Sequence, residues 1–272
     1  MRPRVLVVTA ADESYFRLLD GLLRSLEGRT FPIACFDVGL HPTSRATVAQ
    51  RAQVADPAWD LPVNESANKP AGRASIARPF LPRYFPGFDI YLWIDADAWV
   101  QTPATLDSYI ANAMDGSIAA ATHSHPAYAP TAGILSWRRR RMTAYFGSAA
   151  ADQFPWENYF NSGVFALRAD APHWLCWADA YAMGLKNAEG ALCCDQTALT
   201  YAIWKARLAA NPVPALCNWL CHLALPVFDP IRCQFCEPTA PGDTIGILHL
   251  AGKTKTQSHL HYRNEAARHF HS

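Results

Sequence analysis

Short apolar runs alternate with longer segments of helical spacing along most of this chain. The first run, Arg4–Thr9, is rich in β-branched residues and predicts a strand. Tyr15 and the leucines that follow it recur every three or four positions, which predicts a helix ending near Gly28. Strands that alternate with helices are typical of an α/β protein with a mostly parallel central sheet flanked by helices.

The same alternation continues along the rest of the sequence. Further strands are predicted at residues 31–38, 52–55, 90–94, 117–122, 161–167 and 245–250. Helices are predicted from His41, over residues 74–84 with interruptions at Pro79 and Pro82, and over 103–114, 172–183 and 195–207. Residues 56–73 are expected to form an irregular loop, and residues 123–155 to be the least regular part. Since there is no internal repeat and no long linker, residues 1–272 are expected to form a single domain.

The apolar run Ile90–Ile94 is unbroken and ends in two aspartates, Asp95 and Asp97. Such a run predicts a strand buried on both faces of a parallel sheet, and ligands bind beyond the carboxyl ends of such strands. Side chains two residues apart in an extended segment point to the same side, and two carboxylates together suit a divalent cation. The alternative is a pair of solvated aspartates in a turn.

Composition excludes some partners. Lys and Arg number 24 and Asp and Glu 23, for a net charge of +1, so no overall field attracts nucleic acid or anionic lipid. The N-terminal apolar run is too short for a secretory signal, and no segment approaches the ~20 apolar residues of a membrane span. We therefore expect a cytoplasmic protein without a transmembrane segment, and leave peripheral contact with the inner membrane face open.

Two other patterns have competing interpretations. Cys217, Cys221, Cys233 and Cys236 have the spacing of a four-cysteine zinc site, but scattered buried thiols are the alternative. Trp137 precedes the basic run Arg138–Arg141. This run would suit an anionic acceptor or a membrane surface, although a solvated helix face is favoured.

Polar residues also follow apolar runs or begin helices at five places, and a parallel sheet would bring such positions to one edge. These are Asp12 with Tyr15, Asp95 with Asp97, Asn161, Asp195 with Gln196, and His249 with Lys255. Two carboxylates and the imidazole of His249 would suit Mn²⁺ better than Ca²⁺. Arg78, Lys253 and Lys255 would then surround a diphosphate and stabilise its developing charge.

Taken in order, these motifs resemble the retaining sugar-nucleotide glycosyltransferases of family eight, which include glycogenin and bacterial lipopolysaccharide galactosyltransferases. The resemblance covers residues 5–255 and implies a single-domain glycosyltransferase A-type, Rossmann-like fold. Residues 1–122 would form the nucleotide-binding half, residues 123–255 the acceptor-side half with a closing motif, and residues 256–272 a tail. The family continues its last motif with Pro-Trp, whereas this chain has Thr256-Gln257.

The resemblance also implies roles for individual residues. Asp12 and Tyr15 of the turn that begins at Ala10 would contact uridine, and Arg78 would reach the donor sugar and the diphosphate. Asp95-Ala96-Asp97 would be the metal-binding Asp-x-Asp motif, with His249 as a further ligand of Mn²⁺ or Mg²⁺. The remaining roles would fall to Asn161 on the sugar, to Asp195 and Gln196 beside the anomeric carbon, and to Gly252, Lys255 and its rival Lys253 at the diphosphate.

The implied activity is transfer of a hexose from a UDP-sugar to a saccharide or glycoconjugate acceptor, with retention of configuration. Because Gln196 is a poor nucleophile, a front-face mechanism is favoured over a covalent one. A haloacid-dehalogenase-type phosphatase is an alternative, since its first strand also ends in Asp-x-Asp. The other alternative is a sugar-nucleotide-binding protein without turnover.

Overall fold

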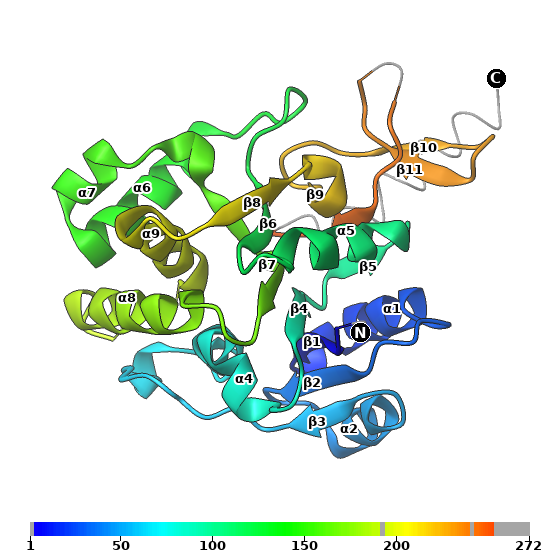
Figure 1. Cartoon of the computed structure of the whole chain (residues 1–272), viewed down its shortest axis with the longest axis horizontal. Coiled ribbons are helices and arrows are strands. Elements are labelled where there is room, and N and C mark those ends of the chain that lie inside the picture. The colour runs from blue at the N-terminus through cyan, green and yellow to red at the C-terminus, as the bar shows by residue number, and fades with distance from the viewer. Residues whose placement is uncertain (1–2, 191–193, 240–241, 253–272) are drawn as a thin grey trace.

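A seven-stranded sheet forms the centre of the computed structural model, which describes residues 3–190, 194–239 and 242–252 (Figure 1). The strand order is β3-β2-β1-β4-β7-β6-β8. β7 is antiparallel to its neighbours β4 and β6, and the other neighbouring strands pair in parallel. The prediction of a mostly parallel sheet is therefore confirmed. The bounds are β1 Val5–Ala11, β2 Ile33–Asp37, β3 Gln53–Ala55, β4 Ile90–Ile94, β6 Ile118–Thr122, β7 Phe160–Arg168 and β8 Ala210–Val213.

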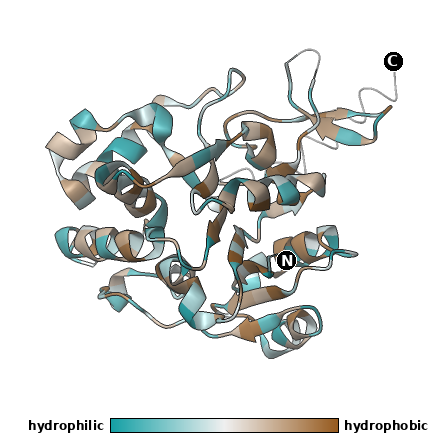
Figure 2. Cartoon of the chain, in the orientation of Figure 1, coloured by the Kyte–Doolittle hydropathy of each residue, from teal (hydrophilic) through white to brown (hydrophobic). Residues whose placement is uncertain are grey.

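Helices cover both faces of this sheet. Alternate residues of β4 face opposite sides, so Leu92 packs with Leu22 and Leu106 on one face, whereas Trp93 packs with Trp177 on the other. Every residue of β4 is buried, as the apolar run predicts, and in Figure 2 much of the hydrophobic colour falls on the central strands. The helices are α1 Phe16–Ser25, α2 Pro42–Ala49, α3 Gly72–Ala77, α4 Leu81–Tyr84, α5 Ala104–Ala113, α6 Ala132–Phe146, α7 Ser148–Gln153, α8 His173–Asn187 and α9 Asp195–Ala206.

A second sheet of three strands lies beyond the end of β4. Its order is β5-β12-β9, with β12 antiparallel to β5 and parallel to β9. Its strands are β5 Ala98–Val100, β9 Trp219–Leu220 and β12 Ile247–His249, and a separate hairpin consists of β10 Val227–Asp229 and β11 Gln234–Cys236. Short 3-10 helices complete the chain: η1 Glu13–Tyr15, η2 Glu65–Ala67, η3 Arg78–Phe80, η4 Trp156–Asn158 and η5 Ala215–Asn218.

The prediction for residues 123–155 is wrong, because this segment contains the helices α6 and α7. The hydroxyl of Thr131 caps α6 by accepting a hydrogen bond from the amide of Ile134, and Gly147 ends the helix with a positive φ of 85°. Both are ordinary helix boundary signals. The basic run was expected to lie on a solvated face, yet Arg138 is buried on the inner side of α6.

Of the two interpretations of the four cysteines, the zinc site does not form among the described residues. Cys221 packs in the core beside Trp219, whereas Cys233 is exposed in the β10–β11 turn. Within the described ranges, one group of three or more potential metal-ligating side chains converges, and it contains no cysteine. The four thiols have the right spacing in sequence but belong to different parts of the fold. No helix in the described ranges has both the length and the apolar character to cross a bilayer.

Candidate functional site

The two aspartates lie in a turn that joins the two sheets. β4 ends at Ile94, and the amide of Asp95 donates to the carbonyl of Gly163 on β7 over 2.7 Å. After Asp97 the chain continues as β5, whose Ala98 is paired with His249 of β12. The backbone pairing between the two sheets therefore brings a residue from near the end of the chain to the acidic turn.

Asp95, Asp97 and His249 present their ligand atoms to one point. These atoms all lie within 4.8 Å of one another, and His249 Nε2 is 3.3 Å from Asp97 Oδ1 and 3.7 Å from Asp95 Oδ2. His249 and Asp97 are buried. Two hard carboxylate oxygens and one imidazole nitrogen fit a divalent cation such as Mn²⁺ or Mg²⁺.

Asn218 sets the orientation of His249. Its side-chain oxygen lies 3.0 Å from His249 Nδ1, and its amide nitrogen donates to Asn161 Oδ1 over 2.9 Å. An amide oxygen only accepts hydrogen bonds, so this network assigns the imidazole proton to Nδ1. The lone pair of Nε2 is then directed at the aspartates, which is the arrangement that a metal-ligating histidine requires.

Arg78 connects the acidic turn to the start of α9. Its guanidinium donates to Asp95 Oδ1 and to Asp195 Oδ2, each over 2.6 Å, and lies 4.5 Å from the centre of the Trp93 ring. Burial raises the pKa of Asp95; Arg78 opposes this effect and Asp97 reinforces it. Asp95 Oδ1 therefore binds Arg78, and Oδ2 faces His249. A cation bound there would offset the electrostatic repulsion between the carboxylates of Asp95 and Asp97.

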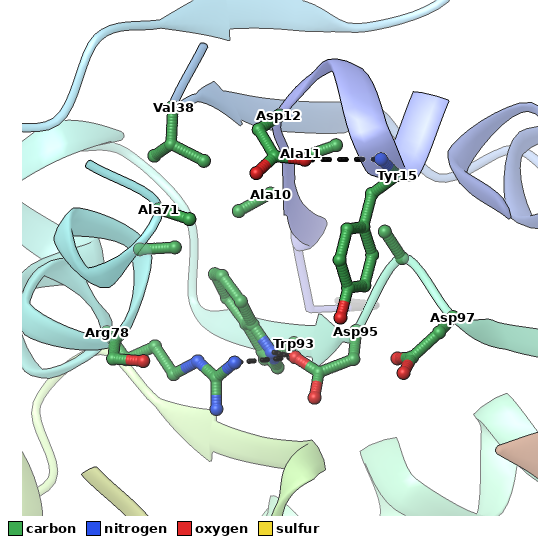
Figure 3. Close-up of a pocket in the computed structure, with 13 residues that line it drawn as sticks. Ala10, Ala11, Asp12, Tyr15, Val38, Ala71, Arg78, Trp93, Asp95 and Asp97 are labelled. Atoms are coloured by element: carbon green, nitrogen blue, oxygen red, sulfur yellow. Dashed lines mark hydrogen bonds and ion pairs between the residues drawn. The ribbon is translucent and has the colours of Figure 1, made fainter. Parts of the chain in front are cut away.

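A pocket lies beside the acidic turn and extends to the end of β1 (Figure 3). Tyr15 and Trp93 project their rings into it, and Asp12 lies at its far end from Arg78. Asp12 also caps η1, since it accepts from the amide of Tyr15 over 3.2 Å. The other lining residues are mostly small and leave space for a flat ring: Ala10, Ala11, Val38, Ala71, Ala74, Ser75 and Ala96.

Asn161 and Gln196 lie in hydrogen-bond contact next to Asp195. Asn161 lies at the start of β7, and its amide nitrogen donates to Gln196 Oε1 over 3.2 Å. Because β7 is antiparallel to its neighbours, its first residues meet the carboxyl ends of β4 and β6. His123, at the end of β6, lies 3.2 Å from Asn161.

The structure thus brings most of the sequence-predicted residues to one edge of the central sheet. Ala10, Asp12, Tyr15, Arg78 and Ala96 line the pocket, and Asp95, Asp97 and His249 converge. Gly252 follows with a positive φ of 70°, whereas Lys253 and Lys255 lie outside the described residues. Sequence reasoning missed Trp93, His123 and Asn218. Trp93 lies within the apolar run that precedes Asp95, whereas no local sequence pattern marks His123 or Asn218.

The fold has clear counterparts among solved structures. No protein-family model and no curated protein sequence matches this chain. The galactosyltransferase LgtC, solved with donor and acceptor sugar analogues, aligns with a TM-score of 0.59 and 16% identity over 91% of this chain and 87% of that one. Mouse xyloside xylosyltransferase 1 aligns with a TM-score of 0.55 and 14% identity over 93% of this chain and 98% of that one. This chain therefore has a glycosyltransferase A-type fold.

Proposed function

We propose that this protein is a metal-dependent retaining glycosyltransferase that transfers a hexose from a UDP-sugar to a saccharide or glycoconjugate acceptor. The observation that supports this most directly is the convergence of Asp95, Asp97 and His249 beside a pocket that Asp12 and Tyr15 also line. This combination suits a nucleoside diphosphate, because Asp12 and Tyr15 would contact its base and the metal-ligating group would face its charge. The glycosyltransferase fold supports the same class of reaction.

In this proposal the donor lies along the pocket. Tyr15 stacks on the uracil and Asp12 accepts a hydrogen bond from it, while Arg78 faces the diphosphate and the sugar. Asn161 contacts the sugar hydroxyls from the start of β7. A divalent cation held by Asp95, Asp97 and His249 would neutralise the charge of the diphosphate leaving group.

The side chains near the proposed sugar position favour attack from the front face. A covalent route needs a free carboxylate beneath the anomeric carbon. Asp195 is the nearest candidate, but its carboxylate is bound to Arg78 at 2.6 Å, and the amide of Gln196 is a poor nucleophile. The acceptor hydroxyl therefore attacks on the side from which the diphosphate leaves. The bond from the anomeric carbon to the phosphate oxygen breaks, the new glycosidic bond forms, and the hydroxyl proton passes to the departing phosphate.

A thermal-shift screen of nucleotide sugars with and without Mn²⁺ tests donor binding, because a ligand of the native state raises its apparent stability. Turnover is then measured as nucleoside diphosphate released from the donor that binds. Asp97→Ala is expected to abolish release and Gln196→Ala to reduce it in part. Full activity of Asp97→Ala contradicts the proposal. Release of inorganic phosphate supports a phosphatase instead, and binding without turnover supports a sugar-nucleotide-binding protein.

A further inference from the structure

Arg138 is a buried cation without a matching anion. Only 5% of it is exposed, whereas Arg139 and Arg140 on the same helix are exposed and Arg139 pairs with Asp152. In the ranges that the structure describes, no carboxylate pairs with Arg138. Its guanidinium contacts Nδ1 of His123 and lies 5.3 Å from the centre of the Tyr159 ring. Buried charges in proteins are normally paired, so this site is one anion short.

His123 cannot satisfy the donors that surround it. Arg138 approaches its Nδ1, while the amide nitrogens of Asn161 and Gln196 approach its Nε2 at 3.2 and 3.5 Å. Burial, and then the charge of Arg138, lower the pKa of His123 well below 6.5, so the ring is neutral. A neutral imidazole has one lone pair, and two sets of donors compete for it.

Turning the Asn161 amide around would not resolve this shortage. Asn161 Oδ1 already accepts from the amide of Gly163 and from Asn218, both over 2.9 Å. Its orientation is therefore fixed by two donors, and its nitrogen must face His123. The donors outnumber the acceptors around His123, which means that the missing group is an acceptor.

The same cluster borders the proposed reaction centre rather than the nucleotide pocket. Asn161 and Gln196 are the residues placed beside the transferred sugar, and neither Arg138 nor His123 lines the pocket of Figure 3. Burial, and then the charges of His249 and Arg138, lower the pKa of His222 to about 4. Its buried Nδ1 has no hydrogen-bond partner among the described residues. An acceptor-rich ligand placed here would touch the sugar side of the site.

We propose that Arg138 binds an anionic group, a carboxylate or a phosphate, carried by a saccharide substrate of this site. The identification of the ligand as a saccharide rests on the proposed function, whereas the burial of the Arg138 guanidinium without a carboxylate partner among the described residues is an observation independent of it. The anion takes the Arg138 hydrogen bonds from His123, whose single lone pair then serves Asn161. The group can belong to the acceptor or to the donor sugar, and these two sources are distinguished by experiment.

Binding is measured by titration calorimetry with matched neutral and anionic probes. The acceptor arm compares methyl β-glucoside with methyl β-glucuronide and glucose 6-phosphate, with and without UDP and Mn²⁺. The donor arm compares UDP-glucose with UDP-glucuronate in the presence of Mn²⁺. Wild-type protein is expected to prefer the anionic probe in one arm by roughly tenfold to a hundredfold, the usual contribution of a charged hydrogen bond.

Variants on the same helix connect that preference to Arg138. Arg138→Gln is expected to abolish it without changing the affinity for UDP and Mn²⁺, and Arg138→Lys to retain part of it. Arg140→Gln, on the exposed side of α6, is the matched control and should behave as wild type. If Arg138→Gln does not fold, as judged by circular dichroism, the test depends on the wild-type preference for the anionic probe and on the reduction of that preference in Arg138→Lys.

Two results would overturn the inference: a wild-type protein that binds neutral and anionic probes equally in both arms, or an Arg138→Gln variant that loses affinity for UDP itself. The second result would assign Arg138 to the diphosphate. Failure of the proposed function is a separate outcome. In that case UDP does not bind, yet the acceptor probes still show an anion preference that depends on Arg138.

Discussion

Gly163 lies where a single added methyl group would enter the candidate metal site. Its φ is not positive, so the backbone conformation of β7 does not require glycine. The lack of space around Gly163, however, does require glycine. A Cβ atom at this position would lie 2.3 Å from His249 Cε1, 2.7 Å from Asp95 Oδ2 and 2.9 Å from Asn161 Oδ1. The strand itself is held in place, because Gly163 donates to Asn161 and accepts from the amide of Asp95.

The size of the required movement can be estimated from these contacts. Raising the Cβ–Cε1 distance from 2.3 Å to the roughly 3.5 Å of a normal carbon contact moves the His249 ring by about 1.2 Å. Metal–ligand distances tolerate only about 0.2 Å. Gly163→Ala is therefore expected to weaken Mn²⁺ binding by at least about tenfold and, through overpacking, to lower the free energy of unfolding by about 1–3 kcal/mol.

Calorimetric titration with Mn²⁺ and urea unfolding measure the two effects. Gly21→Ala in α1 is the matched control, since a Cβ there meets nothing within 4 Å. It should bind Mn²⁺ as wild type does and gain about 0.5–1 kcal/mol of stability from its helical position. If Gly163→Ala binds Mn²⁺ with wild-type affinity, the assignment of the three ligands is refuted.

Three further predictions follow from hydrogen bonds and ligand binding in the same structure. Asn218→Leu removes the acceptor that orients His249 and should weaken Mn²⁺ binding about 10- to 100-fold in calorimetry; unchanged affinity would show that the imidazole is held by other contacts. Burial raises the pKa of Asp37, but two backbone amides and Arg45 outweigh this effect and lower the pKa below 3.8. The contribution of Asp37 to stability is therefore present above pH 3.8 and is lost as the pH falls through the lowered pKa. Asp37→Asn should therefore cost about 1.5–3 kcal/mol near neutral pH and flatten the acid limb of urea-unfolding curves, and an unaltered limb would contradict this. Mn²⁺ at about 100 times its Kd should stabilise the wild-type protein by about 2.7 kcal/mol in unfolding assays, and equal stabilisation of Asp97→Ala would argue against the site.

The sequence allowed most of the central sheet and the acidic half of the site to be predicted, because both depend on local patterns. The apolar run of β4 is buried on both faces and ends in Asp95 and Asp97, as its composition indicates. His249 was expected at the metal through the resemblance of its motif. The apolar run before it was expected to be one more strand, whereas β12 belongs to a second sheet.

The remaining parts depend on contacts between residues that are distant in sequence. Asn218 reaches His249 because η5 and β9 pack beside β12, and no spacing near Asn218 indicates this. The four cysteines show the opposite case: their spacing in sequence suggests a shared zinc ion, but the fold places them in different parts of the structure. In the basic run, four consecutive arginines look alike in composition, yet the helical turn of α6 directs Arg138 inward and leaves its next two neighbours exposed.

The pairing of β12 with β5 also has a consequence during synthesis on the ribosome. Asp97 and His249 are about 150 residues apart, so at typical bacterial and eukaryotic elongation rates roughly 10–30 s separate their production. Throughout this interval the nascent polypeptide exposes an acidic turn that lacks its imidazole. Prematurely terminated products that stop before β12 would keep the first strands that line the pocket but would lack one of the three residues of the candidate cation site.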